Sequence, residues 1–226
     1  MKKLLLFVAV CFITERSSAQ LSIAPELGVQ MSNVRTGSGD SLFSGADTKY
    51  KTGFRAGANL AIGLTKNLNI HVGAFYSTKG TKSEVFGIKA IANTNHIDIP
   101  VYVNYNILTK DGNQFFVGVG PYASYCMSGK TKIKGSFLGV SIDESEDLNI
   151  GSDATDDIKS LDFGANANIG FVSSMGLYAR ASYSLGFANI SNSSAPNSEV
   201  KTTGFALSVG YQFSLNKKNK VAATAE

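Results

Sequence analysis

Two histidines, His71 and His96, are the side chains of this sequence best suited to acid–base chemistry near neutral pH. His96 and Asp98 are two residues apart, so in a strand they share one face, and Ser124 lies on the next strand along the chain. A serine, a histidine and a carboxylate are the groups of a hydrolytic triad, as a lipid-modifying enzyme would need. The strand pattern turns these groups inward, whereas a nucleophile acting on membrane lipid should face outward. We therefore expect a hydrogen-bonded network and no enzyme.

A second candidate is the acidic segment 143–157, which holds five aspartates and two glutamates. Its spacing differs from an EF-hand, because Leu148 occupies the position of the turn glycine. We expect a solvated acidic loop, with binding of divalent cations as the alternative. No other clustered spacing predicts a metal site, and no cofactor is expected. Three lysines precede the segment and could pair either with it or with lipid phosphates: Lys130, Lys132 and Lys134.

The elements that would position these residues are β-strands. From Gly204 to Phe213, large apolar residues alternate with small or polar ones, which is typical of a strand with one apolar face. The same period recurs in seven other segments, with no helical pattern of useful length between them, so the chain is expected to be all-β. The predicted strands cover residues 21–31, 53–64, 68–79, 95–107, 115–126, 161–172, 176–187 and 203–213.

The first residues resemble a secretory signal peptide. Lys2 and Lys3 precede an apolar run, residues 4–13, that is too short to span a bilayer as a helix. Ser17 and Ala19 fit a small-residue cleavage site. We therefore predict a cleaved signal peptide over residues 1–19.

The remainder is expected to form one domain, residues 20–213, followed by a polar tail, residues 214–226. Without the signal peptide the net charge falls from +4 to about +2, which argues against a nucleic-acid partner. Cys126 is then the sole cysteine, so no internal disulfide can form. A closed sheet would provide stability instead.

The connections between the predicted strands alternate in length. Short links at 65–67, 109–114 and 173–175 alternate with long polar links. Outer-membrane barrels have this arrangement, with short turns in the periplasm, long loops outside and an even number of strands. We predict an eight-stranded antiparallel transmembrane β-barrel, an up-and-down meander, with four long extracellular loops, at about 32–52, 80–94, 127–160 and 188–202.

One face of every predicted strand is apolar and carries no Asp, Glu, Lys or Arg, as expected of a band that faces lipid. Aromatic residues gather at the strand ends and aliphatic ones in the middle, which is typical of a barrel in a bilayer. A soluble lipocalin-like barrel, with the faces reversed, is the alternative. The predicted rims are Phe54, Tyr76, Tyr125, Phe163, Phe187 and Phe205 at the outer ends and Tyr105, Phe115, Phe171, Tyr211 and Phe213 at the periplasmic ends.

The opposite face carries most of the strand glycines together with polar residues. The interior of an eight-stranded barrel is only wide enough for side chains, and buried charges need partners. We therefore expect a lumen filled by a structural polar network and no diffusion pore. The network residues are Glu26, Arg55, His96, Asp98, Asp162 and Arg180.

Two features depart from regular strands. Pro100 and Pro121 lie inside central strands, where proline removes a ladder hydrogen bond, so bulges or missing pairs are expected there. The alternating segment 136–142 is expected to extend the strands as a hairpin above the membrane, and a ten-stranded count is the alternative.

Three segments resemble the PorT-like outer-membrane β-barrel family of Bacteroidota, which is similar to the small OmpX and OmpA-type barrels. They are His96–Tyr105 (HIDIPVYVNY), Gly118–Tyr122 (GVGPY) and the terminal Gly210–Phe213 (GYQF). The resemblance implies an integral outer-membrane barrel, and the family's namesake is associated with protein secretion. Phe213 resembles the terminal aromatic residue read by the barrel assembly machinery, although thirteen residues follow it here.

These observations together favour an outer-membrane protein with a structural or surface-binding role carried by its extracellular loops. An accessory subunit of a secretion or envelope machine is the alternative, ahead of a lipid-modifying enzyme, a small pore or a soluble binder. The expected partners are outer-membrane lipid and lipopolysaccharide, the barrel assembly machinery during biogenesis, and other envelope proteins.

Overall fold

The computed structural model describes residues 21–36, 48–85, 88–137, 140–151, 153, 156–192 and 199–215. The predicted signal peptide and most of the predicted tail lie outside these residues. In the described part, no helix is long and apolar enough to cross a bilayer. The strands are β1 (Leu21–Thr36), β2 (Thr48–Gly63), β3 (Leu68–Val85), β4 (Ile88–Leu108), β5 (Gln114–Phe137), β6 (Val140–Asp147), β7 (Leu161–Val172), β8 (Leu177–Gly186), β9 (Val200–Tyr211) and β10 (Phe213–Ser214).

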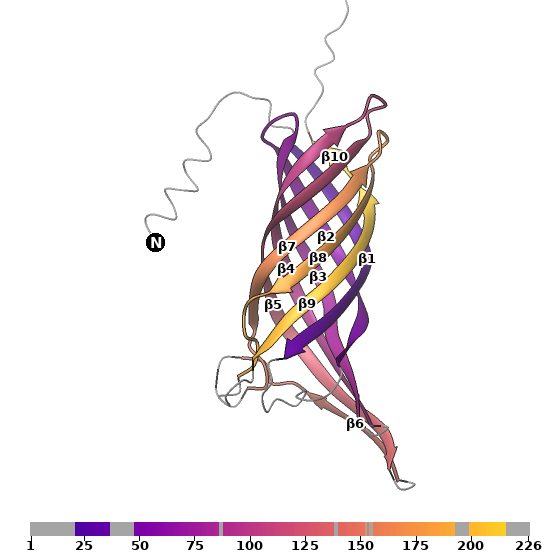
Figure 1. The fold of residues 1–226 in the computed structure, drawn as a ribbon, viewed down its shortest axis with the longest axis vertical. Coiled ribbons are helices and arrows are strands. Elements are labelled where there is room, and N and C mark those ends of the chain that lie inside the picture. The colour runs from indigo at the N-terminus through magenta and orange to yellow at the C-terminus, as the bar shows by residue number, and fades with distance from the viewer. Residues whose placement is uncertain are drawn as a thin grey trace, which may run out of the picture.

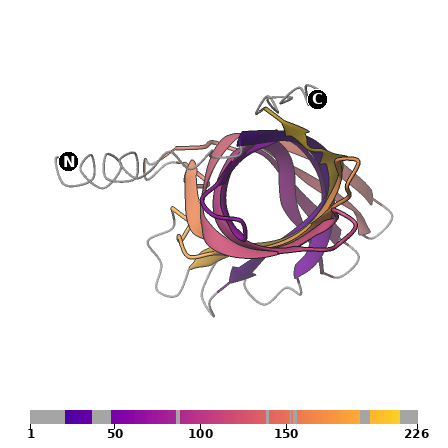
Figure 2. The ribbon, with the colours of Figure 1, turned by 90° about the horizontal axis from the view of Figure 1, so that it is seen from above.

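Eight of these strands form a closed barrel. β1, β2, β3, β4, β5, β7, β8 and β9 pair antiparallel with their neighbours in this order. β9 then pairs with β1, from Gly210 beside Glu26 to Val200 beside Thr36, and this pairing closes the ring. Figure 1 shows the strands wound around one axis, and Figure 2 shows the ring along that axis. The predicted all-β, eight-stranded up-and-down barrel is confirmed.

The other two strands lie outside this closed path. β6 pairs only with β5, from Lys130 beside Asp147 outward. β10 follows β9 after one residue, Gln212, and extends the seam against β1 through Ser22 and Ile23. The sheet thus has ten strands, but the ten-stranded alternative is wrong for the barrel itself.

The outer surface of the barrel is apolar. Leu27, Val119 and Leu207 are 65%, 63% and 62% exposed, although they are aliphatic residues in the middle of strands. The alternate residues of the same strands, such as Gln30 in β1 and Ser208 in β9, are buried inside the barrel. The predicted orientation of the faces is therefore correct, and the reversed faces of a lipocalin-like barrel are wrong.

Aromatic side chains contact one another near both ends of the outer surface. Phe54 and Tyr76 have ring centroids 5.8 Å apart at the end that carries the long connections, which we call the loop end. Phe115 and Phe171 are 4.9 Å apart at the opposite end, which we call the turn end. Such pairs are more favourable than their buried area alone would give, so the rims also stabilise the strand ends.

Glycines shape two of the short turns. Gly112 and Gly176 have φ values of 78° and 92°, which residues with a Cβ rarely adopt. Gly112 N–H donates to the Thr109 carbonyl at 3.1 Å, and Gly176 N–H donates to the Ser173 carbonyl at 2.8 Å. These turns set the registers of the hairpins β4–β5 and β7–β8.

The two prolines interrupt strand pairing, as predicted. Between β3 and β4 the register partners stop at Val72–Val101 and resume at Phe75–Asp98, on either side of Pro100. Between β4 and β5 they stop at Pro100–Tyr122 and resume at Val103–Val119, on either side of Pro121. Proline has no N–H to donate, so one ladder position is lost at each site.

The strands continue further than predicted at the loop end. The predicted loop 80–94 is wrong, because β3 and β4 pair through this region up to Val85 and Ile88. β5 likewise continues past Cys126 to Phe137 and pairs with β6, so the predicted hairpin is present. Hydrogen bonds between the main chains of neighbouring strands form whatever the side chains are. A polar strand therefore need not show the apolar alternation from which strands are predicted. We call residues 78–85, 88–95, 128–137 and 140–147 the surface sheet, which projects beyond the barrel at the lower end of Figure 1.

Candidate functional site

The barrel interior holds all six residues predicted for the polar network. Glu26, Arg55, Asp162 and Arg180 are at most 6% exposed, and His96 and Asp98 are 7% and 8% exposed. They form three groups and not one network. The groups are Glu26 with Arg55 and Arg180, His96 with Asp98, and Asp162 with residues outside the predicted set.

In the first group, one carboxylate serves two guanidinium groups. Glu26 Oε1 lies 3.8 Å from Arg55 NH2 and 3.9 Å from Arg180 NH1. Asn59 connects them further, because its Nδ2 donates to Glu26 Oε2 at 3.0 Å and its Oδ1 accepts from Arg180 at 3.2 Å. Arg180 also lies 3.3 Å from His71 Nδ1. The residues come from β1, β2, β3 and β8, so the group links strands around the barrel.

Aromatic rings complete the surroundings of these cations. The Arg55 guanidinium lies 4.0 Å from the ring centroid of Phe75. Arg180 lies 5.0, 5.2 and 5.8 Å from the centroids of Tyr102, Tyr178 and Phe116. Cation–π contacts are strengthened by desolvation, so these rings help to keep both charges inside.

These inward rings were not among the glycines and polar residues predicted for the inner face. Their positions alternate with the outward residues of the same strands, so the period of two could have revealed them. Inward glycines make room for them. A Cβ on Gly170 would collide with the Phe116 ring, and one on Gly73 would meet Phe75 and Asn59.

The second group lies nearer the loop end and depends on Lys79, which the prediction omitted. Lys79 Nζ donates to Asp98 Oδ1 at 2.7 Å and to Ser124 Oγ at 3.1 Å. Ser77 Oγ donates to Asp98 Oδ2 at 2.5 Å, and His96 Nδ1 is 3.0 Å from Ser124 Oγ. Lys79 occupies the inward position two residues beyond Ser77, so strand parity could also have identified it.

The third group binds Asp162 through hydroxyl groups. Tyr122 and Thr202 donate to Asp162 Oδ2 at 3.0 and 2.6 Å. The Lys79 ammonium lies 5.7 Å from the Tyr122 ring centroid, which joins the second and third groups. Asp162 therefore has hydrogen-bond donors and no direct ion pair among the described residues.

The interior leaves little free space. A cavity of about 20 Å³ adjoins Asp98, Arg55 and Tyr122, which is enough for a water molecule and too small for a solute. Ser124, the candidate nucleophile, is 1% exposed and bonded to both His96 and Lys79. A substrate could not approach it, so the geometry suits a structural network better than a triad. The buried side chains, which the ribbon of Figure 2 does not draw, thus occupy the inside of the ring.

The acidic segment is partly a strand and not a loop. Its residues 143–147 belong to β6, and two of its aspartates face lysines of β5. Lys130 pairs with Asp147 and Lys134 with Asp143, each at 3.0 Å. No group of three or more His, Cys, Asp or Glu side chains in the described part of the chain could hold a metal ion. Of the two alternatives for the lysines, pairing with the acidic segment therefore holds for Lys130 and Lys134.

A closed antiparallel barrel with an aliphatic outer belt, two aromatic rims and a filled polar interior defines an integral outer-membrane β-barrel protein. Residues 14–192 match the family described as outer membrane protein beta-barrel domain. The chain belongs to this family, which places it in the outer membrane. No curated protein matches the chain significantly.

Several solved barrels are similar in fold to this chain. The attachment invasion locus protein Ail of Yersinia pestis, in complex with the heparin analogue sucrose octasulfate, is 15% identical with a TM-score of 0.42, covering 86% of this chain and 99% of Ail. Neisserial surface protein A is 11% identical with a TM-score of 0.43, covering 85% and 97%. The N-terminal barrel domain of Pseudomonas aeruginosa OprF is 14% identical with a TM-score of 0.30, covering 86% and 99%.

Proposed function

We propose that this outer-membrane barrel is a non-conducting structural and surface-binding protein whose contacts are made by the surface sheet and its neighbouring connections. The observation that carries the proposal is the combination of a filled lumen with strands longer than a membrane needs. A transmembrane strand needs about 9–11 residues, whereas β4 and β5 have 21 and 24. The additional length is exposed backbone ladder and charged side chains, which suit recognition better than transport.

The chemistry of the interior supports a role without catalysis. The charged side chains of the three buried groups contact one another or neighbouring polar side chains, and the candidate nucleophile Ser124 is enclosed. An enzyme acting on membrane lipid would need its nucleophile on the outer face, where the described belt is aliphatic and aromatic.

A role as accessory subunit of a secretion or envelope machine is the second candidate. It is supported by the resemblance of His96–Tyr105, Gly118–Tyr122 and Gly210–Phe213 to the PorT-like family of Bacteroidota. In this role the surface sheet or the turn end would contact a larger assembly. Both roles include three further proposals. The signal peptide is cleaved, lipopolysaccharide surrounds the belt, and the barrel assembly machinery is the partner during biogenesis.

Three measurements on the full chain test these roles. Unboiled protein should migrate differently from boiled protein in SDS, as a detergent-resistant barrel does, and planar bilayers containing it should show no stepwise conductance. Steady ion-conducting steps from the folded protein would refute the filled lumen. Cross-linking on intact cells should distinguish the two roles, since a machine subunit would be recovered in one large complex of fixed composition.

A further inference from the structure

The outward face of β4 and β5 passes from the apolar belt into a polar region just above it. Ile97 and Tyr125 are register partners at the edge of the belt, and the next outward pair is Asn95 and Ser128. Asn95 Nδ2 donates to Ser128 Oγ at 2.9 Å. A tilted strand rises roughly 2.5 Å per residue along the barrel axis, so this pair lies about 5–8 Å above the belt edge. That is the outer limit of the lipid headgroups, which extend about 5–7 Å beyond the hydrocarbon on each side. Lys132 is four residues further along β5, so at the same rise it lies roughly 10 Å above this pair.

The outward side chains of the surface sheet form rows across its strands. One row runs from Lys82 on β3 through Ile91 on β4 and Lys132 on β5 to Ser145 on β6. The lysines on both sides of this row, on the same face of β5, are neutralised by the carboxylates of β6. Within the described residues, neither Lys82 nor Lys132 has a carboxylate at ion-pair distance. This row therefore carries two uncompensated positive charges on neighbouring sides of Ile91.

A third amine adds to this positive potential. The pKa of Lys51 is lowered, first by partial burial and then by the positive charge of Lys82. Lys51 lies in β2, beyond Phe54 of the aromatic rim, and so in the same polar region. Positive charges that outnumber the carboxylates around them favour binding of an anion.

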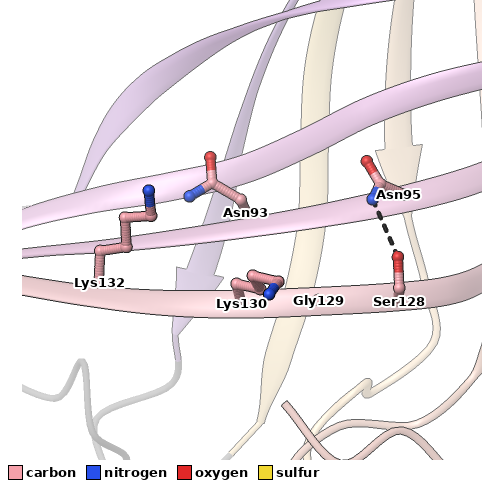
Figure 3. A pocket seen from close by; sticks show the side chains of 6 residues that line it. All are labelled: Asn93, Asn95, Ser128, Gly129, Lys130 and Lys132. Carbon is pink, nitrogen blue, oxygen red and sulfur yellow. Dashed lines mark hydrogen bonds between the residues drawn. The ribbon is translucent and has the colours of Figure 1, made fainter. Parts of the chain in front are cut away.

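A pocket of about 280 Å³ lies between this row and the belt. Figure 3 shows the Asn95–Ser128 hydrogen bond at one end of the pocket and Lys132 at the other, with Asn93 between them on β4. Amide, hydroxyl and ammonium groups are donors that suit phosphate oxygens. Its lining residues are Asn93, Asn95, Ser128, Gly129, Lys130 and Lys132.

We propose that this pocket binds the phosphate group of an outer-leaflet lipid whose acyl chains lie along the belt below Asn95 and Ser128. The inference rests on the proposed outer-membrane placement, since only then does a lipid headgroup reach this height. Ile97, Ile99 and Tyr125 offer the apolar surface for the chains. Lys132, which lines the pocket, and Lys82, on the other side of Ile91, supply positive potential from above the headgroup. The pocket lining ends at Asn95 and Ser128, the pair next to Ile97 and Tyr125 of the belt.

The test uses the refolded full chain in a neutral detergent, with binding of lipid A measured by native mass spectrometry. Each lysine near a membrane surface contributes about fivefold in affinity for anionic lipid. The double variant Lys82→Gln/Lys132→Gln should therefore bind lipid A about 30-fold more weakly. The matched control Lys89→Gln/Lys134→Gln removes the same charge from the row that has acidic partners, and should stay within about twofold of the wild type. A lipid of the same chains without phosphate should not be retained.

Each other outcome overturns the inference in a defined way. Equal losses in both double variants would mean diffuse electrostatic attraction and no site. Saturable binding of inorganic phosphate that displaces no lipid A would identify a free anion as the ligand. Absence of lipid A binding by a protein that still shows the mobility shift on boiling would refute this site while leaving the barrel proposal intact. Absence of the mobility shift itself would refute the barrel proposal instead.

Discussion

Replacing Glu26 by glutamine should strongly destabilise the barrel, because one buried carboxylate balances two buried cations. At an effective dielectric constant of about 20, its pairs with Arg55 and Arg180 at 3.8 and 3.9 Å are each worth about 4 kcal/mol before desolvation is counted. Removing one partner of a buried pair typically costs about 3–5 kcal/mol, since the remaining charge stays buried. With a urea dependence of about 2 kcal/mol per molar, the unfolding midpoint should fall by roughly 1.5–2.5 M.

The chain has no tryptophan, so the folded fraction in lipid vesicles is best read from the gel-mobility shift across a urea series. Glu84→Gln is the matched control, because the Glu84–Lys89 pair is solvent-exposed and 3.7 Å long and should contribute at most about 0.5 kcal/mol. Adding Arg180→Met to the Glu26 variant should recover part of the loss, which keeps the test informative if the single variant folds poorly. Equal midpoints for the Glu26 and Glu84 variants would refute the reasoning.

Three further changes probe the belt, a turn and the second buried group. Leu207→Arg places a charge on the lipid-facing belt, where the side chain is 62% exposed. It should lower the free energy of unfolding by about 2–4 kcal/mol. An unchanged folding yield in vesicles would argue against a lipid-facing side. Gly176→Val forces a β-branched residue to φ 92° and should cost about 1–3 kcal/mol, seen as a lower urea midpoint. Lys79→Met removes the cation 2.7 Å from Asp98 and should lower the free energy of unfolding by about 3–5 kcal/mol. Adding Asp98→Asn should recover part of this stability. No recovery would mean that packing and not charge explains the loss.

The barrel and its orientation could be predicted because both depend on the period of two. A belt facing lipid excludes charge along whole strands, so a few residues such as Leu27 and Leu207 fix the side on which all others lie. The same alternation places Glu26, Arg55 and Arg180 inside. Their mutual distances depend on which strands adjoin after closure, and that requires the register between β9 and β1.

The partners of the interior groups were harder to predict for the same reason. The alternation predicts Asp98 as a buried charge, but its cation Lys79 is the last residue of the predicted strand 68–79, whereas β3 extends to Val85. Once β3 continues outward, Lys79 remains an inward residue and reaches Asp98 and Ser124. Strand ends are marked by turn residues in sequence, and polar strands beyond the membrane carry no apolar pattern to extend them.

Periodicity alone cannot predict which way the lysines of β5 point. Inside the barrel the even-numbered residues of β5 face inward, from Phe116 to Cys126. Asn95 pairs with Ser128, but His96 pairs with Cys126, so Met127 is an extra residue in β5. A bulge of one residue moves every following side chain to the other face. Lys130 and Lys132 therefore point outward beside the membrane surface, where an unbroken alternation would have placed them above the lumen. The bulge at Met127 thus separates the part of β5 whose polar side chains face the barrel interior from the part whose lysines face outward.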